Sequence, residues 1–447
     1  MSAASDAGGA GAWAARVYEI DKRAAGICTL MSVNGFAFDR AAGAELAERL
    51  KVAEAAARLA AHEAVGREIA SGKSGGFSNK DLARAFFQDL RAPVYFRSDA
   101  TNAPSIGVDA LRAYAACADP RLRALALAVL EWRRARKIRV TYIENVELGD
   151  DLRVHPTWLN YGAVSGRFAC QGPNLMNLPT QRTDPTIVWG RDAKGRKVIE
   201  SGGIRSLYVA RPGYVLVGFD AKQLEMRIAA YASQDATMIQ ACESSDLHAG
   251  NAAVIFGDAF LNGDDATRYA LRNLAKQSGF AVCYMAEAAT VHARIAAAGE
   301  SVTLRQVEAM LAKLRRAFRG YFQWQDRRLL DVVRTGWVSE PVTGRRRWLG
   351  HDPSPTEAAN FPIQGGAAGL MNSKLPAIVA RLAQELPRVK IVAQVHDAGV
   401  FEAPEAQAGH VVRVCNEAFA MPIVLDTPAG PCEAVFPIDI GVEAKWH

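Results

Sequence analysis

Two aspartates follow short apolar segments of this chain and could hold divalent metal ions. Asp220 follows residues 217–219, and Asp397 lies just after residues 391–395. A buried strand can deliver a carboxylate to the edge of a sheet in this way. Two such carboxylates can hold a pair of divalent metals for phosphoryl or nucleotidyl transfer. Either aspartate alone would more often be a turn or cap residue, so the pair needs support from other residues.

A third segment, between these two, combines cations and aromatic rings. Arg272, Lys276, Phe280 and Tyr284 recur every fourth residue, which places them on one slowly drifting face of a helix. The cations would neutralise the charge of a triphosphate, and the rings would stack on a nucleobase. The alternative is a solvated basic face above two core rings.

Together these three segments resemble the polymerase motifs of family A DNA polymerases, the DNA polymerase I-like enzymes. Their order is the same: an Asp-containing strand, an Arg-x3-Lys-x3-Phe-x3-Tyr helix and then His-Asp. Further segments are similar to that family: Ser165-Gly166-Arg167 with residues 173–179, Asp246-Leu247-His248, Thr343-Gly344-Arg345-Arg346-Arg347, and residues 360–365. The resemblance runs from near residue 20 to the C-terminal Lys445-Trp446-His447.

The resemblance implies an α+β chain with the right-hand polymerase fold, in which an antiparallel palm sheet accompanies a mainly helical thumb and fingers. We expect a disordered tail at 1–16, a thumb with an N-terminal palm-associated segment at 17–149, palm at 150–235, fingers at 236–340 and palm again at 341–447. Helices are expected at 41–69, 78–90, 107–117 and 119–147, and strands at 205–219, 390–402 and 434–443. Few residues precede the first family-like segment, so we expect a bare polymerase module without a proofreading or flap-nuclease domain.

The resemblance also assigns roles at the reaction centre. Two Mg²⁺ ions, with Mn²⁺ as a substitute, would be held by Asp220, Asp397 and the backbone carbonyl of Ala221. Lys276 would contact the α-phosphate and donate a proton to the leaving pyrophosphate. Arg272 and His248 would contact the outer phosphates.

Other residues would select the nucleotide and hold the DNA. Phe280 would pack on the incoming sugar and base, Tyr284 would stack at the template position, and Glu225 would exclude a ribose 2′-hydroxyl. Gln223 is placed with these nucleotide contacts. The primer–template contacts implied by the resemblance or by clustered charge are Arg167, Asn174, Asn360, Gln364, His396, Arg133, Arg136, Lys137, Arg345 and Arg346.

The chain departs from the family pattern at several positions. Ala398 follows Asp397 where the family usually has Glu, which removes a secondary metal or water contact. Met285 and Ala281 replace glycines and are expected to stiffen the fingers helix. These changes suggest a divergent branch, of phage or prophage type.

The composition is that of an ordinary globular protein, and the positive charge is unevenly placed. The net charge is +6, half of the residues are hydrophobic and 22% are charged. Two basic tracts, at 121–139 and 305–347, favour contacts with a phosphate backbone over two solvated helix faces. The seven cysteines show no metal-ligand spacing, and no signal peptide or bilayer-spanning segment is recognisable. We therefore expect reduced thiols and a cytoplasmic location, in a bacterium or a phage-infected cell.

The sequence predicts a template-directed DNA polymerase that acts as a monomer on primer–template DNA and dNTPs, without a membrane. A separate exonuclease or processivity factor is compatible with this prediction. Two alternatives stay open: a non-catalytic primer–template binding protein, for which Ala398 is the main support, and a polymerase that prefers an RNA template, as a reverse transcriptase does. Glu225 argues against a single-subunit RNA polymerase, and a metal-dependent nuclease would need an acidic cluster that the sequence lacks.

Overall fold

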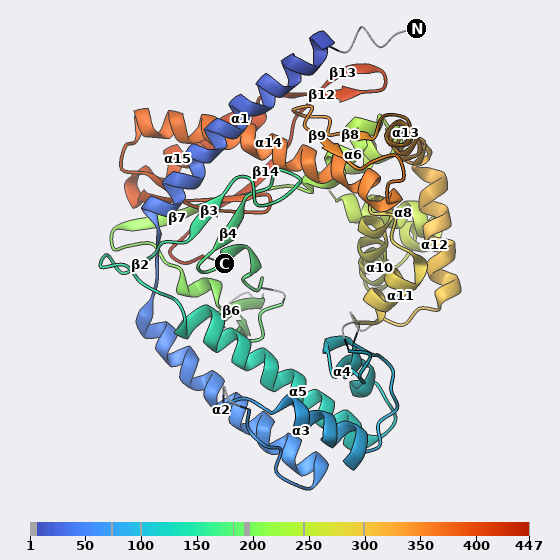
Figure 1. Ribbon diagram of the computed structural model, residues 1–447. Coiled ribbons are helices and arrows are strands. Elements are labelled where there is room, and N and C mark those ends of the chain that lie inside the picture. The colour runs from blue at the N-terminus through green and yellow to red at the C-terminus, as the bar shows by residue number, and fades with distance from the viewer. Residues whose placement is uncertain are drawn as a thin grey trace. The chain divides into compact units, whose positions relative to one another are not determined.

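The computed structural model describes residues 7–72, 75–98, 101–181, 183–191, 197–244, 246–297 and 300–446 (Figure 1). Side chains are described for these residues except 7–12, 197–198, 280–283 and 297. The side chain of Phe280, a predicted nucleotide contact, therefore lies outside the described residues. The chain forms two compact units, one of Met1–Phe36, His155–Met176 and Ala210–Ala444, and another of Ala37–Val154, Asn177–Val209 and Lys445–His447. We call them the large and the small unit.

The large unit is built around a four-stranded antiparallel sheet in the order β10-β11-β7-β14. These strands are β7 (Tyr214–Ala221), β10 (Lys390–Val395), β11 (Ala398–Pro404) and β14 (Ile438–Glu443). Helix α15 (Ala408–Ala420) packs on β7, β11 and β14, and α1 (Ala7–Asn34) packs on β10. Strands β10 and β11 are almost wholly buried, which explains why their sequences are mainly apolar.

Helices form most of the rest of the large unit. They are α6 (Leu224–Ser233), α7 (Ala236–Glu243), α8 (Leu247–Phe256), α9 (Asp258–Leu261), α10 (Asp265–Cys283), α11 (Ala288–Ala297), α12 (Leu304–Ala317), α13 (Arg319–Thr335) and α14 (Pro355–Glu385). A buried cluster that includes Met238, Ile255, Leu314, Phe318 and Tyr321 joins α7, α8, α12 and α13. Three hairpins complete the unit: β3 (Thr157–Leu159) with β4 (Ala169–Gln171), β8 (Trp337–Ser339) with β9 (Arg346–Trp348), and β12 (Ile423–Thr427) with β13 (Gly430–Ala434).

Helices α8 and α10 approach each other closely because a glycine faces the contact. A Cβ atom on Gly279 would lie 2.5 Å from Nδ2 of Asn251, which is closer than real atoms come. Ala275, one turn earlier on α10, is fully buried. Small residues on this side of α10 therefore let it pack on α8, close enough for Arg272 to reach Asp246, the N-cap of α8.

The small unit is a helical arrangement in which α2 (Arg40–Val65) lies along α5 (Pro120–Arg139). It also contains α3 (Asn79–Arg84), α4 (Val108–Ala115), the π-helical turns η1 (Ala85–Asp89) and η2 (Val140–Glu144), the 3₁₀ turn η4 (Arg205–Leu207), β2 (Arg153–Val154) and the β5 (Val188–Arg191) and β6 (Lys197–Ser201) hairpin. Aspartates at the N-caps of α2 and α5, Asp39 and Asp119, accept backbone hydrogen bonds that fix where these helices begin. The elements β1 (Phe36–Ala37) and η3 (Leu175–Asn177) lie where the chain passes between units, and η5 (Glu405–Gln407) precedes α15.

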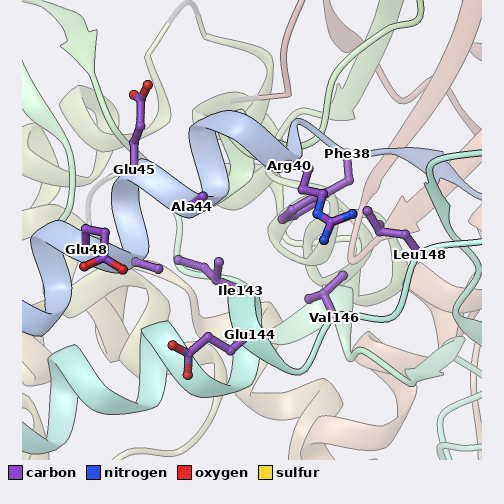
Figure 2. A pocket seen from close by; sticks show the side chains of 10 residues that line it. Phe38, Arg40, Ala44, Glu45, Glu48, Ile143, Glu144, Val146 and Leu148 are labelled. Atoms are coloured by element: carbon purple, nitrogen blue, oxygen red, sulfur yellow. The ribbon is translucent and has the colours of Figure 1, made fainter.

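A pocket of about 690 Å³ opens in the small unit between the start of α2 and the end of η2 (Figure 2). Phe38 and Ile143 lie along it, and acidic side chains stand at its rim. Two of these acids are already paired inside the unit, Glu48 with Lys51 at 2.8 Å and Glu144 with Arg139 at 2.6 Å. The pocket therefore offers little uncompensated charge with which to select a ligand.

The predicted fold class is confirmed, and the helices expected at 41–69, 78–90, 107–117 and 119–147 are present as α2, α3 with η1, α4, and α5 with η2. The expected tail is wrong for residues 7–16, because α1 begins at Ala7. Alanine-rich sequence favours a helix there, and Trp13 lies under the guanidinium of Arg346, 5.2 Å from it. Within the described residues no helix is both long and apolar enough to cross a bilayer.

The expectation that Met285 stiffens the fingers helix is also wrong. Helix α10 ends at Cys283, and Met285 lies in the following turn with φ 53°. This left-handed conformation is easy for glycine and costs other residues about 1–2 kcal/mol. The methionine therefore strains a turn rather than extending a helix.

Replacing Met285 with glycine should stabilise the protein by about 1 kcal/mol relative to Met285→Ala, because alanine keeps the Cβ atom that makes the left-handed turn costly. Urea unfolding of the two variants would measure this difference. An alanine variant as stable as the glycine variant would contradict the proposed strain.

Candidate active site

The sheet brings the two predicted metal-binding aspartates together at one edge. Asp220 is the penultimate residue of β7, and Asp397 lies in the two-residue turn between β10 and β11. In the register of β11 and β7, Ala398 lies opposite Asp220. The backbone N–H of Ala221 donates a 3.0 Å hydrogen bond to the carbonyl of Asp397. Two segments far apart in sequence are thus joined directly through their backbones.

Both of these segments carry a strained residue. His396, the first residue of the turn, has φ 54°, and Gln223, just after β7, has φ 48°. The Gln394 side chain donates a short hydrogen bond from Nε2 to the carbonyl of His396 and so holds the turn. Non-glycine residues in the left-handed conformation cluster at functional sites, where interactions of the surrounding structure offset their strain. No sequence pattern indicates that Gln394 holds this turn.

Arg167 connects two of the predicted site carboxylates. Its Nη2 atom donates a short hydrogen bond to Oε1 of Glu225, which lies in the first turn of α6. The same Nη2 atom is 3.9 Å from Oδ1 of Asp397. A predicted DNA contact, the predicted sugar selector and a predicted metal ligand are therefore one charged cluster.

The carboxyl group of Asp397 is in an unusual electrostatic environment. Burial raises its pKa to about 7, the Glu225 and Asp220 carboxylates act in the same direction, and Arg167 opposes them. Its Oδ1 atom is buried and accepts no hydrogen bond from any described residue. A carboxylate oxygen with these properties is suited to a bound cation.

The donor set fits Mg²⁺ that is held jointly by protein and substrate. No group of three or more His, Cys, Asp or Glu side chains gathers in a metal-binding arrangement within the described part of the chain. Mg²⁺ in phosphoryl-transfer sites is commonly bound by one or two carboxylates, with substrate phosphates and water as the other ligands. Asp220 and Asp397 supply these two carboxylates.

The row of residues across the sheet contains one more acid. Asp439 on β14 lies opposite Asp220, on the side away from Ala398. Residues directly opposite each other on neighbouring strands share one face of a sheet. The Asp439 carboxylate pairs with Lys222, with Nζ 2.7 Å from Oδ1. This chain has Ala398 where the family usually has a glutamate after the second aspartate. On the other side of Asp220, the nearest acid across the sheet is Asp439, which is ion-paired with Lys222.

A second group of predicted residues lies on α8 and α10. Arg272 donates from Nε to Oδ2 of Asp246 at 2.5 Å and from Nη2 to Oδ1 at 3.2 Å. Asp246 also caps α8 through the backbone N–H groups of His248 and Ala249. Burial alone would raise the pKa of Asp246, but the Arg272 and capping hydrogen bonds hold it below its ordinary value. Asp246 thus fixes both the start of α8 and the orientation of Arg272.

The other predicted nucleotide contacts on these helices are only partly described. His248 is buried at the start of α8, and Lys276 is half-buried on α10, one turn after Arg272. Tyr284 lies just after the end of α10, so the last of the four residues predicted to share one helix face is outside the helix. The Tyr284 ring packs against the buried cluster of the helices.

Glu340 is a structural residue of the site that sequence reasoning missed. It is fully buried and accepts hydrogen bonds from backbone N–H groups in residues 342–345 and from the Thr343 hydroxyl. Burial raises its pKa, while these hydrogen bonds act in the opposite direction. Glu340 therefore shapes the turn that carries Arg345. The burial of this acid is visible only in the structure, so the sequence alone carries no signal for its role.

Arg345 is held on both sides by predicted motif residues and by α1. Its guanidinium donates a short hydrogen bond to Asp21, and a Cβ atom on Gly166 would lie 2.9 Å from its Nε. Gly166 has φ 81°, so this position needs glycine for its conformation and for its space. Asn372 donates to the carbonyl of Gly166 at 2.9 Å and fixes the same turn.

The other predicted DNA contacts fall in several places. Asn360 and Gln364 lie one turn apart on α14 and are half-buried, His396 is exposed, and the Asn174 side chain accepts from the Met176 backbone at 3.0 Å. Arg133, Arg136 and Lys137 belong to α5 of the small unit. There Arg133 donates to the carbonyl of Ile106 at 2.8 Å, and burial lowers its pKa, so its guanidinium has a structural partner.

Comparisons with known proteins agree with this arrangement. Residues 41–441 match the model of DNA polymerase family A. The thermostable DNA polymerase I of Thermus aquaticus is 27% identical over 444 residues, which cover 96% of this chain and 48% of that protein. DNA polymerase I of Treponema pallidum is 27% identical over 349 residues, which cover 75% of this chain and 32% of that protein. The chain thus spans about half the length, or less, of the curated relatives it matches.

A solved structure shows the same fold. The polymerase domain of Pol1 from M. smegmatis, in complex with DNA primer-template and dNTP, superposes with a TM-score of 0.74 at 24% identity, covering 94% of this chain and 69% of that one. The match to the family model extends over most of the sequence. This chain belongs to DNA polymerase family A.

Proposed function

We propose that this chain is a DNA-directed DNA polymerase that adds dNTPs to the 3′-hydroxyl of a primer. The observation that carries the proposal is the joining of β7 to the β10–β11 turn, which sets Asp220 and Asp397 at one sheet edge beside Arg167 and Glu225. Family membership and the solved complex of a relative, which holds primer-template and dNTP, support the same activity.

Asp220, Asp397 and the carbonyl of Ala221 would hold two Mg²⁺ ions, for which Mn²⁺ is a substitute. When bound, such ions lower the pKa of the attacking hydroxyl and stabilise the leaving pyrophosphate. The two aspartates supply the negative charge that brings the ions and the triphosphate together. Because burial raises the pKa of Asp397 to about 7, a bound cation would favour its ionised form.

Residues of α8 and α10 would bind the triphosphate. Arg272 and His248 are assigned to the outer phosphates, and Lys276 to the α-phosphate and to protonation of the pyrophosphate. Asp246 orients Arg272 before the nucleotide arrives, which reduces the ordering needed on binding. Phe280, Tyr284 and Gln223 would contact the nucleotide or its template partner.

We propose the predicted subdomains: a thumb with an N-terminal palm-associated segment at 17–149, palm at 150–235 and 341–447, and fingers at 236–340. The DNA would contact the thumb through α5 and the palm through Arg167, Asn360, Gln364 and His396. We propose that the chain acts as a monomer.

The competing proposal, a non-catalytic primer–template binding protein, rests on Ala398. In the structure this residue lies opposite Asp220 and leaves that position without a third carboxylate. Both aspartates with their strained supporting turns are present, which favours catalysis.

Primer extension separates these proposals. Wild-type protein with Mg²⁺ and a DNA template should extend the primer with dNTPs and much less with rNTPs, and Asp397→Ala should not extend it. Tight primer–template binding without extension by the wild type would support the binding protein. An RNA template in a parallel reaction tests the reverse-transcriptase alternative.

A further inference from the structure

The end of α13 and the β8–β9 hairpin form an exposed surface that combines tryptophans and arginines. Trp337 is 44% exposed and Trp348 is 53% exposed, and their ring centroids lie 4.9 Å apart in a T-shaped contact. With Arg328, Arg334 and Arg346 they make what we call the Trp-Arg surface. Single exposed apolar residues are common, but two adjacent exposed tryptophans are a large apolar area to leave in water.

The backbone is shaped to hold one of these rings. Gly336, at the C-cap of α13, has φ 76°, and a Cβ atom on it would lie 2.2 Å from the Trp348 ring. The ring therefore rests directly against the end of the helix. His351 makes a perpendicular contact on the same ring at 5.6 Å. The two tryptophan rings are already held in place before any ligand binds, so binding loses little free energy to ordering them.

A surface pocket of about 420 Å³ lies beside Trp337, and the charged residues that line this pocket favour an anion. Its lining contains Arg328, Arg334 and Arg346 against a single acid, Asp331. Asp331 lies 2.7 Å from Arg328 and 3.1 Å from Arg334 and so orders both guanidinium groups. Its one negative charge does not neutralise three arginines. The Arg334 side chain is 77% exposed and faces solvent.

We infer that the Trp-Arg surface binds single-stranded nucleic acid. Aromatic rings beside a basic pocket match an unpaired strand, whose bases can stack on the rings while its phosphates meet the arginines. A duplex hides the faces of its bases, so it would use the arginines alone. The inference goes beyond the proposed polymerase activity, because this surface would bind an unpaired strand without metal ions or nucleotides.

The test measures binding of a fluorescein-labelled oligothymidylate by anisotropy, in EDTA and without dNTPs. The double variant Trp337→Ala/Trp348→Ala should lose affinity by at least about tenfold, because stacking of bases on aromatic rings makes up a large part of single-strand affinity. Trp337→Phe/Trp348→Phe should retain most of the affinity. Trp189→Ala is the matched control, because Trp189 is a tryptophan of similar exposure, 39%, on a hairpin of the small unit.

Salt dependence provides a second measurement that does not alter the tryptophans. Arg334→Ala should reduce the slope of log affinity against log salt by about 1, while the phenylalanine variant should keep the wild-type slope. Unchanged affinity in the folded alanine double variant would overturn the inference. So would an unchanged slope in Arg334→Ala, or displacement of the oligothymidylate by a polyglutamate peptide of equal affinity, which would assign the surface to an acidic protein segment. Because the assay omits metal and dNTPs, a failure of primer extension does not affect it.

Discussion

Replacing Asp397 with asparagine should lower the rate of primer extension by about 10³-fold or more. An amide is a neutral and weaker metal ligand, and a loss of several kcal/mol of charge stabilisation in the transition state corresponds to such a factor. The change preserves the size of the side chain in the β10–β11 turn. Single-turnover extension with saturating dNTP and primer–template would measure it. A variant that keeps a tenth or more of the wild-type rate would show that Asp397 is not a metal ligand.

The same variant should make the metal-free protein more stable at pH 8. Asp397 has a pKa of about 7 in the folded chain, against an ordinary value of 3.8, and its side chain is only 23% exposed. A raised pKa means that the folded state holds the proton more tightly than the unfolded state. The free energy of unfolding therefore falls as the pH rises from about 4 to about 7, by roughly 2–4 kcal/mol in total. Asparagine carries no such proton and escapes this loss.

Urea unfolding in EDTA at pH 5 and at pH 8 would test this sign. The gain from Asp397→Asn should be larger at pH 8 than at pH 5, because at pH 5 only the first part of the fall in stability between about pH 4 and pH 7 has occurred. Asp352→Asn, at an exposed aspartate, is the control and should change little at either pH. An equal gain at both pH values would mean that the asparagine acts through packing rather than through charge.

The sequence was sufficient to predict the sheet and its two aspartates because their signals are local. A short apolar segment before each aspartate is a property of neighbouring residues, and β7, β10 and β14 lie within or close to the predicted strands. The long-range register is different. That Ala398 and Asp439 flank Asp220 depends on three strands from distant parts of the chain. No local pattern carries that information.

Errors arose where one residue type serves two purposes. Glycine-rich sequence near the N-terminus is typical of a tail, but the alanines among these glycines also favour the helix that begins at Ala7. Met285 was placed inside a helix, because the spacing of Arg272 to Tyr284 continues past the point where α10 ends. Buried polar partners such as Glu340 and Gln394 were missed, because their role is to satisfy turns whose geometry the sequence does not reveal.

Replacing Glu225 with alanine should raise the incorporation of ribonucleotides relative to deoxyribonucleotides by about 10²-fold. Exclusion of one hydroxyl by a side chain at a binding surface has an effect of this order. Glu225 is well placed for this role, because α6 begins just after Asp220 and the Glu225 side chain is only 17% exposed. The ratio of kcat/KM for rNTP and dNTP on one template would measure the change. An unchanged ratio would remove Glu225 from sugar selection.

The ion pair with Arg167 predicts how two further variants should differ. Glu225→Gln keeps the length of the side chain but loses the charge that Arg167 binds, and Arg167→Ala keeps the carboxylate but releases it. If the selector works by occupying a fixed position, both variants should lose part of the discrimination, and less than Glu225→Ala. If only bulk mattered, Glu225→Gln would discriminate like the wild type. Because Arg167 also lies 3.9 Å from Asp397, Arg167→Ala should in addition slow dNTP incorporation, whereas Glu225→Gln should affect that rate less. The two variants thus separate the positioning of the proposed sugar selector from the charge balance at the proposed metal site.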